Sequence, residues 1–292
     1  MGGAGASRIS AVSDNSGPNV ITIDGHAIEY RLERRGGSTA LILHGGHMSA
    51  RCRFGEETFL EVGYSVLITS RPGYGRTAVA AGPSAPEFAV RLAGLCRLLD
   101  LAELTVVGIS LGARSALTLA AFYPELVQRV ILLCPTSFRS WPDARGRLLG
   151  YAAFAPGVQR LTWGTLHYLL RRDPDKYLAG IVENLTTLNG EVAVRQLGAD
   201  VGKVIEFLLC CQSGRGFLKD LRATTDVSGD VAQPTLILAT RNDGAVSFDH
   251  AEYLAVTLPD PTLVEVHTPT HLLWLGEGSD RTASAIESFL RS

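Results

Sequence analysis

The sequence lacks any apolar run that approaches the roughly 20 residues needed to span a bilayer. It also lacks, at its start, the continuous apolar segment of a secretory signal. Residues 1–18 are instead rich in glycine and serine, and we expect them to form a flexible N-terminal tail. These two absences favour a cytoplasmic protein with no membrane span.

Neither sign of charge is in excess. The 27 basic and 29 acidic residues give a formal net charge of -2. A charge this close to zero does not indicate binding to nucleic acid or to an anionic membrane. We therefore expect no nucleic-acid partner and predict a small-molecule substrate as the partner. The sequence leaves the oligomeric state open.

Cysteine is also sparse. The five cysteines are odd in number and lack the spacing of metal ligands, which argues against a disulfide framework and against a zinc site. Because a free cysteine behaves as a small hydrophobic residue, we expect the adjacent Cys210 and Cys211 to pack in a helical core. We predict no metal and no cofactor.

Apolar residues, by contrast, make up 46% of the chain, enough for a sizeable core. Residues 19–33 predict a hairpin around Asp24-Gly25, because such a pair between apolar residues favours a tight turn. Short apolar runs then alternate with helical periodicity, which is typical of parallel strands covered on both faces. The predicted strands are 39–44, 65–69, 104–109, 130–133, 235–239 and 262–267, and the clearest helices are 85–99, 113–123 and 248–258.

Residues 137–230 interrupt this alternation, with several helical stretches and no convincing buried strand. We therefore predict an α/β core of residues 19–136 and 231–292, with a mostly parallel central sheet flanked by helices. The helical segment 137–230 would be inserted as a cap over the edge of that sheet.

A Gly-x-Ser-x-Gly motif at residues 108–112 joins a buried strand to a helix, the context in which this motif carries chemistry. The tight turn would raise the side chain of Ser110 above the sheet as a nucleophile. The backbone N–H of Leu111, at the start of the helix, would point at a developing oxyanion. The alternative is an ordinary serine in a glycine-rich connection.

The strand at 39–44 also ends in a glycine-containing loop, His44-Gly-Gly-His47. With this loop and the serine motif, the sequence resembles the α/β-hydrolase family, in particular serine hydrolases of the carboxylesterase or lipase type with a helical cap. The resemblance implies that Gly46 supplies a second oxyanion N–H. The turn Ser70-Arg-Pro-Gly-Tyr-Gly-Arg-Thr is similar to one in the family, and we give its Arg71 and Tyr74 mainly structural roles.

His44 and His47 flank the glycine pair. If these histidines bound a metal ion, the site would need further ligands. No cluster of carboxylates or cysteines completes such a site in the sequence. We expect a structural hydrogen bond from His44 and a position for His47 facing the substrate pocket.

A serine nucleophile needs a base and a carboxylate that orients it, in the chain order serine, acid, histidine. Asp243 follows the strand at 235–239 in a loop that matches the family's acid loop, with Asp249 as its nearest rival. His271 follows the final strand and is the predicted general base, with His267 as the alternative. Members of the family often have glycine before this histidine, where the present chain has Thr270.

These residues predict hydrolysis of a carboxylic ester or related acyl bond through an acyl-enzyme. Aromatic residues of the cap favour a small, largely apolar substrate, which we expect to contact His47, Trp141 and Trp163. A thioester, a lactone or a carbon–carbon bond would suit the same residues. A noncatalytic ligand receptor that keeps the fold is the alternative from a different class.

Overall fold

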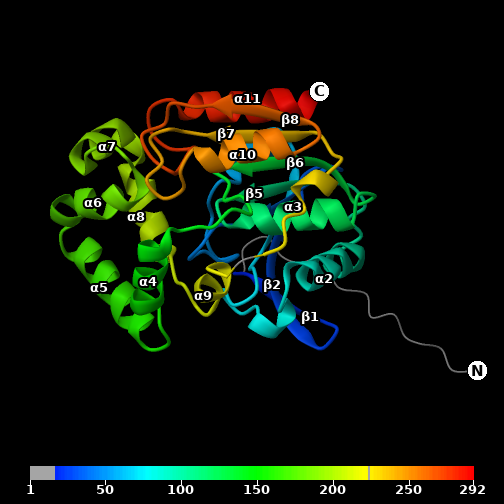
Figure 1. Ribbon diagram of the computed structural model, residues 1–292, viewed down its shortest axis with the longest axis horizontal. Helices are drawn as coiled ribbons and strands as arrows, with labels where there is room; N and C mark the ends of the chain where they lie inside the picture. Colours follow the sequence, from blue (N-terminus) through cyan, green and yellow to red (C-terminus); the bar gives the residue numbers. More distant parts are fainter. Residues whose placement is uncertain (1–16, 223) are drawn as a thin grey trace, which may run out of the picture.

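A computed structural model describes residues 17–222 and 224–292 (Figure 1). Of the tail predicted for residues 1–18, all but Gly17 and Pro18 lie outside the described residues. The described residues form one eight-stranded sheet in the order β1-β2-β4-β3-β5-β6-β7-β8. The strands are β1 (Asn19–Ile23), β2 (His26–Glu33), β3 (Thr39–Leu43), β4 (Ser65–Thr69), β5 (Leu104–Ile109), β6 (Val127–Leu133), β7 (Thr235–Ala239) and β8 (Pro261–Glu265).

The sheet begins as the predicted hairpin. Asp24 and Gly25 form its turn with φ of 48° and 78°, a conformation that suits the aspartate and glycine found there. β2 then pairs antiparallel with β4, and all remaining pairs in the sheet are parallel. The predicted mostly parallel sheet is confirmed.

Helices cover both faces of the sheet. One face packs against α2 (Ala85–Leu98), α3 (Gly112–Phe122) and α10 (Asp249–Thr257), and the other against α1 (Glu57–Glu61) and α11 (Ser279–Arg291). Successive residues of a strand point to opposite faces, so Val106 of β5 joins the first core and Val107 the second. This two-sided burial explains why the central strands are continuous apolar runs.

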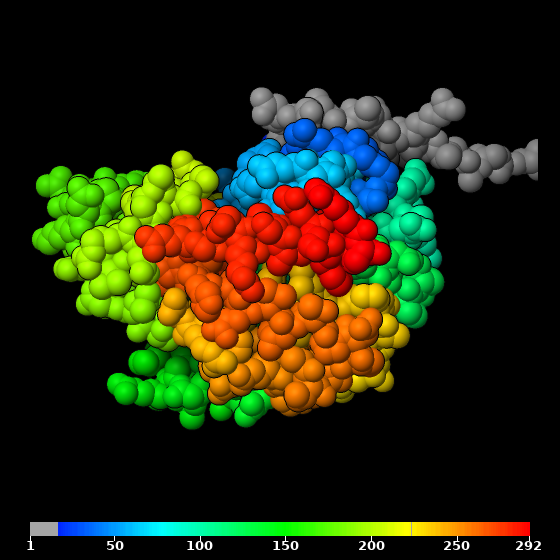
Figure 2. Space-filling view, turned by 90° about the horizontal axis from the view of Figure 1, so that it is seen from above, coloured from blue at the N-terminus to red at the C-terminus, as the bar shows by residue number. Residues whose placement is uncertain are grey.

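The segment between β6 and β7 is helical and projects from one side of the sheet, as Figure 2 shows from above. Its helices have a core of their own, which also receives Met48 and Phe54 from the loop after β3. The division into core and cap at residues 137 and 230 stays a prediction. The helices are α4 (Ala144–Ala153), α5 (Val158–Arg172), α6 (Pro174–Val182), α7 (Gly190–Leu197), α8 (Val201–Cys210) and α9 (Gly216–Asp220).

The end of the last strand differs from the sequence prediction. The last strand ends at Glu265, so its predicted extension to His267 is wrong. Its partner strand β7 stops at Ala239, opposite Glu265, and the last hydrogen bond between the two strands runs from the N–H of Val266 to the Ala239 carbonyl. Within the described residues, no helix combines the length and the apolar character needed to cross a membrane.

A buried ion pair holds the loop after β3 to the sheet. The guanidinium of Arg31, on β2, donates to both carboxylate oxygens of Glu56, at 2.9 and 2.6 Å, and to the carbonyl of Ala50 at 3.2 Å. Both side chains are less than a tenth exposed. Removing Arg31 leaves the buried Glu56 charge with only the exposed Arg53, 3.8 Å away, as a partner, which compensates little of the cost of burial.

Replacing Arg31 by methionine should therefore lower the free energy of unfolding by about 3–5 kcal/mol, measured by urea denaturation. The matched control is Arg35→Met, which breaks the exposed pair of Arg35 with Glu33 and should change stability by no more than about 0.5 kcal/mol. Equal effects of the two substitutions would contradict this account of the loop.

Candidate active site

The predicted site residues follow neighbouring strands at one edge of the sheet. β3, β5, β6, β7 and β8 are adjacent and parallel, so their carboxyl ends meet at the same edge. Gly46 follows β3, Ser110 follows β5, Asp243 follows β7 and His271 follows β8. Ligands of open α/β sheets bind outside this edge.

Ser110 occupies a strained turn between β5 and α3. Its φ of 52° is uncommon for a residue with a side chain. A Cβ at Gly108 would lie 2.6 Å from Ala113 Cα, and one at Gly112 would overlap the carbonyl oxygen of Leu43. The glycines of the motif are therefore required by close packing of the turn against α3 and β3.

The loop after β3 lies directly against this turn. A Cβ at Gly45 would lie 3.0 Å from Ser110 Cβ, and one at Gly46 would lie 3.1 Å from Leu111 Cδ1. Within residues 17–222 and 224–292, neither the N–H of Gly46 nor that of Leu111 donates a hydrogen bond. Two backbone donors beside Ser110 are thus free to bind an oxygen atom.

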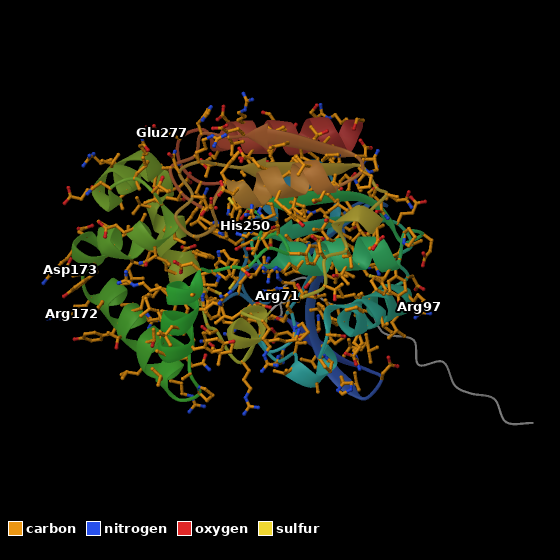
Figure 3. All side chains as sticks on the ribbon, in the orientation of Figure 1. Arg71, Arg97, Arg172, Asp173, His250 and Glu277 are labelled. Atoms are coloured by element: carbon orange, nitrogen blue, oxygen red, sulfur yellow. The ribbon has the colours of Figure 1, made fainter. Side chains whose placement is uncertain are left out.

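Arg71 fixes the shape of this loop. Its guanidinium donates to the carbonyls of His44 and Gly45, at 2.7 and 3.0 Å, and makes two hydrogen bonds to the Asp220 carboxylate, at 2.9 and 2.8 Å. The Tyr74 hydroxyl donates to the same carboxylate at 2.7 Å. Figure 3 shows Arg71 in the interior beside α9, where it joins the sheet to the helical segment. Both residues of the Gly-rich turn thus make structural contacts.

Asp243 and His271 form a close pair. His271 Nδ1 lies 2.6 Å from Asp243 Oδ2, while Asp243 Oδ1 accepts the N–H groups of Ala245 and Val246 at 2.7 and 2.8 Å. The carboxylate is therefore fixed by its own loop and orients the imidazole. This contact uses Nδ1 of the ring, so Nε2 is not engaged by Asp243.

The two rival residues lie away from this pair. Asp249 is exposed at the start of α10. The side chain of His267 is 79% exposed and faces Glu265 at 3.9 Å. Of the candidates, only Asp243 and His271 lie within hydrogen-bonding distance of one another among the described residues.

Ser110, Asp243 and His271 are each less than a tenth exposed. Within the part of the chain that the structure describes, no hydrogen bond joins Ser110 Oγ to His271. Such contacts are often long in enzymes without substrate and shorten in the reacting complex. The three side chains expose little surface in this conformation.

The threonine before His271 does not disturb the loop. Among the described residues with positive φ, Thr270 is absent, so this position does not need glycine. Thr270 is fully buried, and its Oγ1 accepts the N–H of Leu272 at 3.2 Å. The departure from the family's usual glycine is accommodated by an extra hydrogen bond.

The helical segment supports both loops through residues that sequence motifs do not identify. The N–H of His271 donates to the carbonyl of Leu185 at 2.8 Å, and Thr186 Oγ1 donates to the carbonyl of Pro269 at 2.7 Å. Thr186 also pairs with Asp243 in an isolated antiparallel bridge. The short stretch of Leu185 and Thr186 thus contacts the loops of both Asp243 and His271.

Cys134, the residue after β6, also contacts the loop of His271, which the sequence did not predict. It has a φ of 44°, and its thiol donates to the carbonyl of His271 at 3.2 Å. Burial raises the pKa of this thiol well above its usual value, so it stays protonated. Its position at a strand end was the one signal in the sequence that could have identified it.

Cys134, Asp243 and His271 bring three potential metal-ligand atoms within 4.8 Å of one another. A metal ion with bonds of about 2.0–2.3 Å would hold its ligands further apart than the 2.6 Å between His271 and Asp243. The short contact fits a shared proton.

His47 lies in an aromatic cluster at the junction with the helical segment. Ser213 Oγ accepts the indole N–H of Trp163 at 2.8 Å and lies 2.7 Å from His47 Nδ1, so its own hydrogen can bind that nitrogen. Burial lowers the pKa of His47 to about 3. The ring is therefore neutral, and when the Ser213 hydroxyl donates to Nδ1 the ring hydrogen is on Nε2. The rings packed around it are those of Phe154, Trp163 and Phe217.

Trp141 lies at the beginning of the helical segment, in the same region. Its indole N–H donates to the carbonyl of Ala245 at 2.9 Å, in the loop of Asp243. Its ring meets Phe217 edge-on, with centroids 6.4 Å apart. The three side chains predicted to contact substrate therefore lie in one aromatic region, with Phe217 between two of them.

The family model described as alpha/beta hydrolase fold matches residues 41–276, most of the chain. The chain belongs to this family. Its relatives include the uncharacterized hydrolase YcgS of Bacillus subtilis, 31% identical over 93% of this chain and 98% of that protein. Another is the pimeloyl-[acyl-carrier protein] methyl ester esterase of Aromatoleum aromaticum, 27% identical over 86% of this chain and 97% of that protein.

The fold has the same support from solved structures. An alpha/beta hydrolase fold protein from Nakamurella multipartita superimposes with a TM-score of 0.78 over 94% of this chain and 99% of that one, at 21% identity. The predicted fold class is confirmed, and the family supports a hydrolase.

His44 of this α/β hydrolase is structural, as its hydrogen bond to the Phe54 carbonyl at 3.1 Å indicates. Nε2 carries the hydrogen, and within the described residues buried Nδ1 has no partner. Burial lowers the pKa of His44 to about 4. The folded state therefore resists a proton that the unfolded chain accepts.

Since the unfolded state binds that proton near pH 6.5 and the folded state only near pH 4, stability is lost as the pH falls between these values. We expect His44→Asn to reduce the loss over this window by about 3 kcal/mol. Urea denaturation at several pH values measures the free energy of unfolding of both proteins. The free energy of each protein at pH 7 is the reference for its own loss. Parallel pH profiles for the two proteins would contradict the assignment.

Proposed function

We propose that this protein is a serine hydrolase that cleaves a carboxylic ester or related acyl bond through an acyl-enzyme. In this proposal Ser110 is the nucleophile, His271 the general base and Asp243 the carboxylate that orients it. The N–H groups of Gly46 and Leu111 bind the oxyanion. No cofactor takes part.

The observation that carries the proposal is the 2.6 Å contact of His271 with Asp243 at the sheet edge that also holds Ser110. The Asp243 carboxylate is itself held by two backbone N–H groups. A serine hydroxyl is a weak nucleophile at neutral pH, and an oriented imidazole is what activates it.

In the reaction, His271 Nε2 takes the hydroxyl proton while Ser110 Oγ attacks the substrate carbonyl. The imidazolium that forms is stabilised by Asp243 and returns the proton to the leaving alcohol. Water, deprotonated by His271, then attacks the acyl-enzyme and frees Ser110. One oxyanion donor of this kind contributes roughly 10²–10³ in rate.

We further propose that the helical segment is a cap over the site, and that His47, Trp141 and Trp163 contact the substrate. The aromatic surroundings of His47 favour an apolar acyl group. Because burial keeps His47 neutral, its Nε2–H can donate a hydrogen bond to a substrate oxygen without placing a charge in an apolar pocket.

Among acyl bonds, an ester is the first choice. The relative from Aromatoleum aromaticum is named as a methyl ester esterase, and it aligns with most of this chain. A series of p-nitrophenyl esters of increasing acyl length, with acyl thioesters and lactones of matched length alongside, measures the preference directly.

We expect Ser110→Ala to lower kcat/KM for the best ester by ~10³-fold or more, because no other group can form the acyl-enzyme. A fluorophosphonate probe should label the wild-type protein at Ser110 and leave the variant unlabelled. Unchanged hydrolysis by the variant would refute the mechanism. Absence of labelling across a broad pH range would instead support a noncatalytic receptor.

The two histidines near the end of β8 allow a matched comparison. His271→Gln should abolish most ester hydrolysis, since the base is lost, whereas His267→Gln should retain it, because that side chain is 79% exposed and faces Glu265. Steady-state kinetics and circular dichroism distinguish lost catalysis from lost folding. A larger loss of ester hydrolysis in His267→Gln than in His271→Gln would assign the role of general base to His267.

A further inference from the structure

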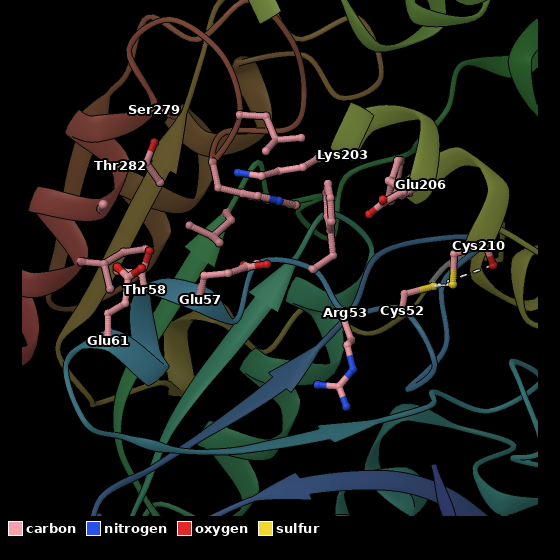
Figure 4. Close-up of a pocket in the computed structure, with 18 of the residues that line it drawn as sticks. Cys52, Arg53, Glu57, Thr58, Glu61, Lys203, Glu206, Cys210, Ser279 and Thr282 are labelled. Carbon is pink, nitrogen blue, oxygen red and sulfur yellow. Dashed lines mark hydrogen bonds between the residues drawn. The ribbon is translucent and has the colours of Figure 1, made fainter. Parts of the chain in front are cut away.

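Two thiols that are distant in the sequence meet at the boundary between the core and the helical segment. Cys52 lies in the loop between β3 and α1, and Cys210 is the last residue of α8. Their sulfur atoms are 2.6 Å apart. Figure 4 shows the two side chains pointing toward one another. As expected, both adjacent cysteines pack in the core of the helical segment: Cys211 is buried in it, and Cys210 is half-buried, packs against it and also faces Cys52.

This separation exceeds the disulfide bond length of about 2.04 Å by only about half an ångström. Cys96 and Cys134 are buried in the cores of the sheet, in different surroundings. Among the described cysteines, no other pair makes a contact between sulfur atoms. Cys52 and Cys210 are therefore the described cysteines whose sulfur atoms lie close enough to form a disulfide.

Cys210 of this pair is accessible to small molecules. Both cysteines line a groove of about 660 Å³ between α1, α8 and α11, which Figure 4 shows. The groove's lining includes Arg51, next to Cys52, and none of Ser110, Asp243 and His271. A soluble oxidant can reach Cys210 from this groove without entering the candidate active site, whereas Cys52 lies buried behind it.

The two thiols differ in reactivity. The hydrogen bond from Cys52 lowers the pKa of the Cys210 thiol to about 7, with a further contribution from Arg51. The same hydrogen bond, together with burial, raises the pKa of Cys52. Cys210 is thus the half-exposed nucleophile, and a thiol with a pKa near the ambient pH is well suited to attack a disulfide.

We propose that Cys52 and Cys210 form a reversible redox pair that a small-molecule disulfide converts into an intramolecular disulfide between the loop after β3 and α8. The Cys210 thiolate attacks the small disulfide and releases one small thiolate. Cys52 then loses its proton, attacks Cys210 Sγ and releases the second. Two protein thiols are oxidised and one small disulfide is reduced to two thiols.

The bond would link two segments that are now held only by noncovalent contacts. Cys52 belongs to the same loop as Gly45 and Gly46, while α8 packs in the core of the helical segment. Oxidation would therefore fasten that segment to the loop. The disulfide does not depend on the proposed hydrolase reaction, and a protein without ester hydrolysis would form it equally well.

The test treats the full chain with oxidised glutathione at pH 8, alkylates the remaining thiols and maps peptides by mass spectrometry. We expect the loss of two hydrogen atoms, a Cys52–Cys210 cross-link and full reversal by dithiothreitol. A stable glutathione adduct without the cross-link would overturn the proposal. So would a cross-link through Cys211 or between two chains.

Substitutions separate the two roles. Cys52→Ser should retain glutathione on Cys210, because the resolving thiol is missing, whereas Cys210→Ser should remain unmodified at Cys52. The matched control is Cys211→Ala, which changes the adjacent buried thiol and should still form the cross-link. Loss of the cross-link in a folded Cys211→Ala protein would transfer the role to that residue.

Closing a loop of this length should raise the thermal midpoint of the oxidised protein by ~5 °C over the reduced protein. Neither Cys52→Ser nor Cys210→Ser should show the increase, and Cys211→Ala should. An unchanged or lowered midpoint in the cross-linked wild-type protein would show that the native structure does not accommodate the bond and would overturn the proposal. Ester hydrolysis is a separate readout, so failure of either proposal is recognised independently.

Discussion

The close approach of α3 to the end of β3 is the constraint on which the candidate site depends. With glycine at 108 and 112, the turn between β5 and α3 can lie against the Leu43 carbonyl and hold Ser110 at positive φ. The same contact brings the Gly45-Gly46 loop beside the serine. A side chain at either glycine would separate these segments, so the position of Ser110 and that of the two free N–H donors beside it depend on the same contact.

The site is completed from two directions. The sheet supplies the loops of Asp243 and His271, and the helical segment holds both loops in place through Leu185 and Thr186. It also supplies Ser213, whose hydroxyl joins His47 to Trp163. The placement of Asp243 and His271 therefore depends on contacts with the helical segment, although the segment carries none of the three proposed catalytic side chains.

Much of this could be predicted from the sequence, because it follows from short-range rules. Continuous apolar runs identified the parallel strands, and strand order then brought Ser110, Asp243 and His271 to one edge. The contacts of Asp220, Thr186 and Ser213 could not be predicted, since each is a single polar residue in a helical segment without a motif, and its partner lies more than fifty residues away. The strand end at Glu265 was missed because apolar residues continue beyond it, and only the length of the neighbouring strand decides where pairing stops.

The attachment of residues 212–220 has a mechanical consequence. The N–H of Gln212 donates to the His47 carbonyl, those of Arg215 and Gly216 donate to Gly73, and the Asp220 carboxylate is shared by Arg71 and Tyr74. Moving α9 would leave several buried polar groups unpaired at once. α9 therefore behaves as part of the rigid body that contains the sheet, although it lies between β6 and β7 in the sequence.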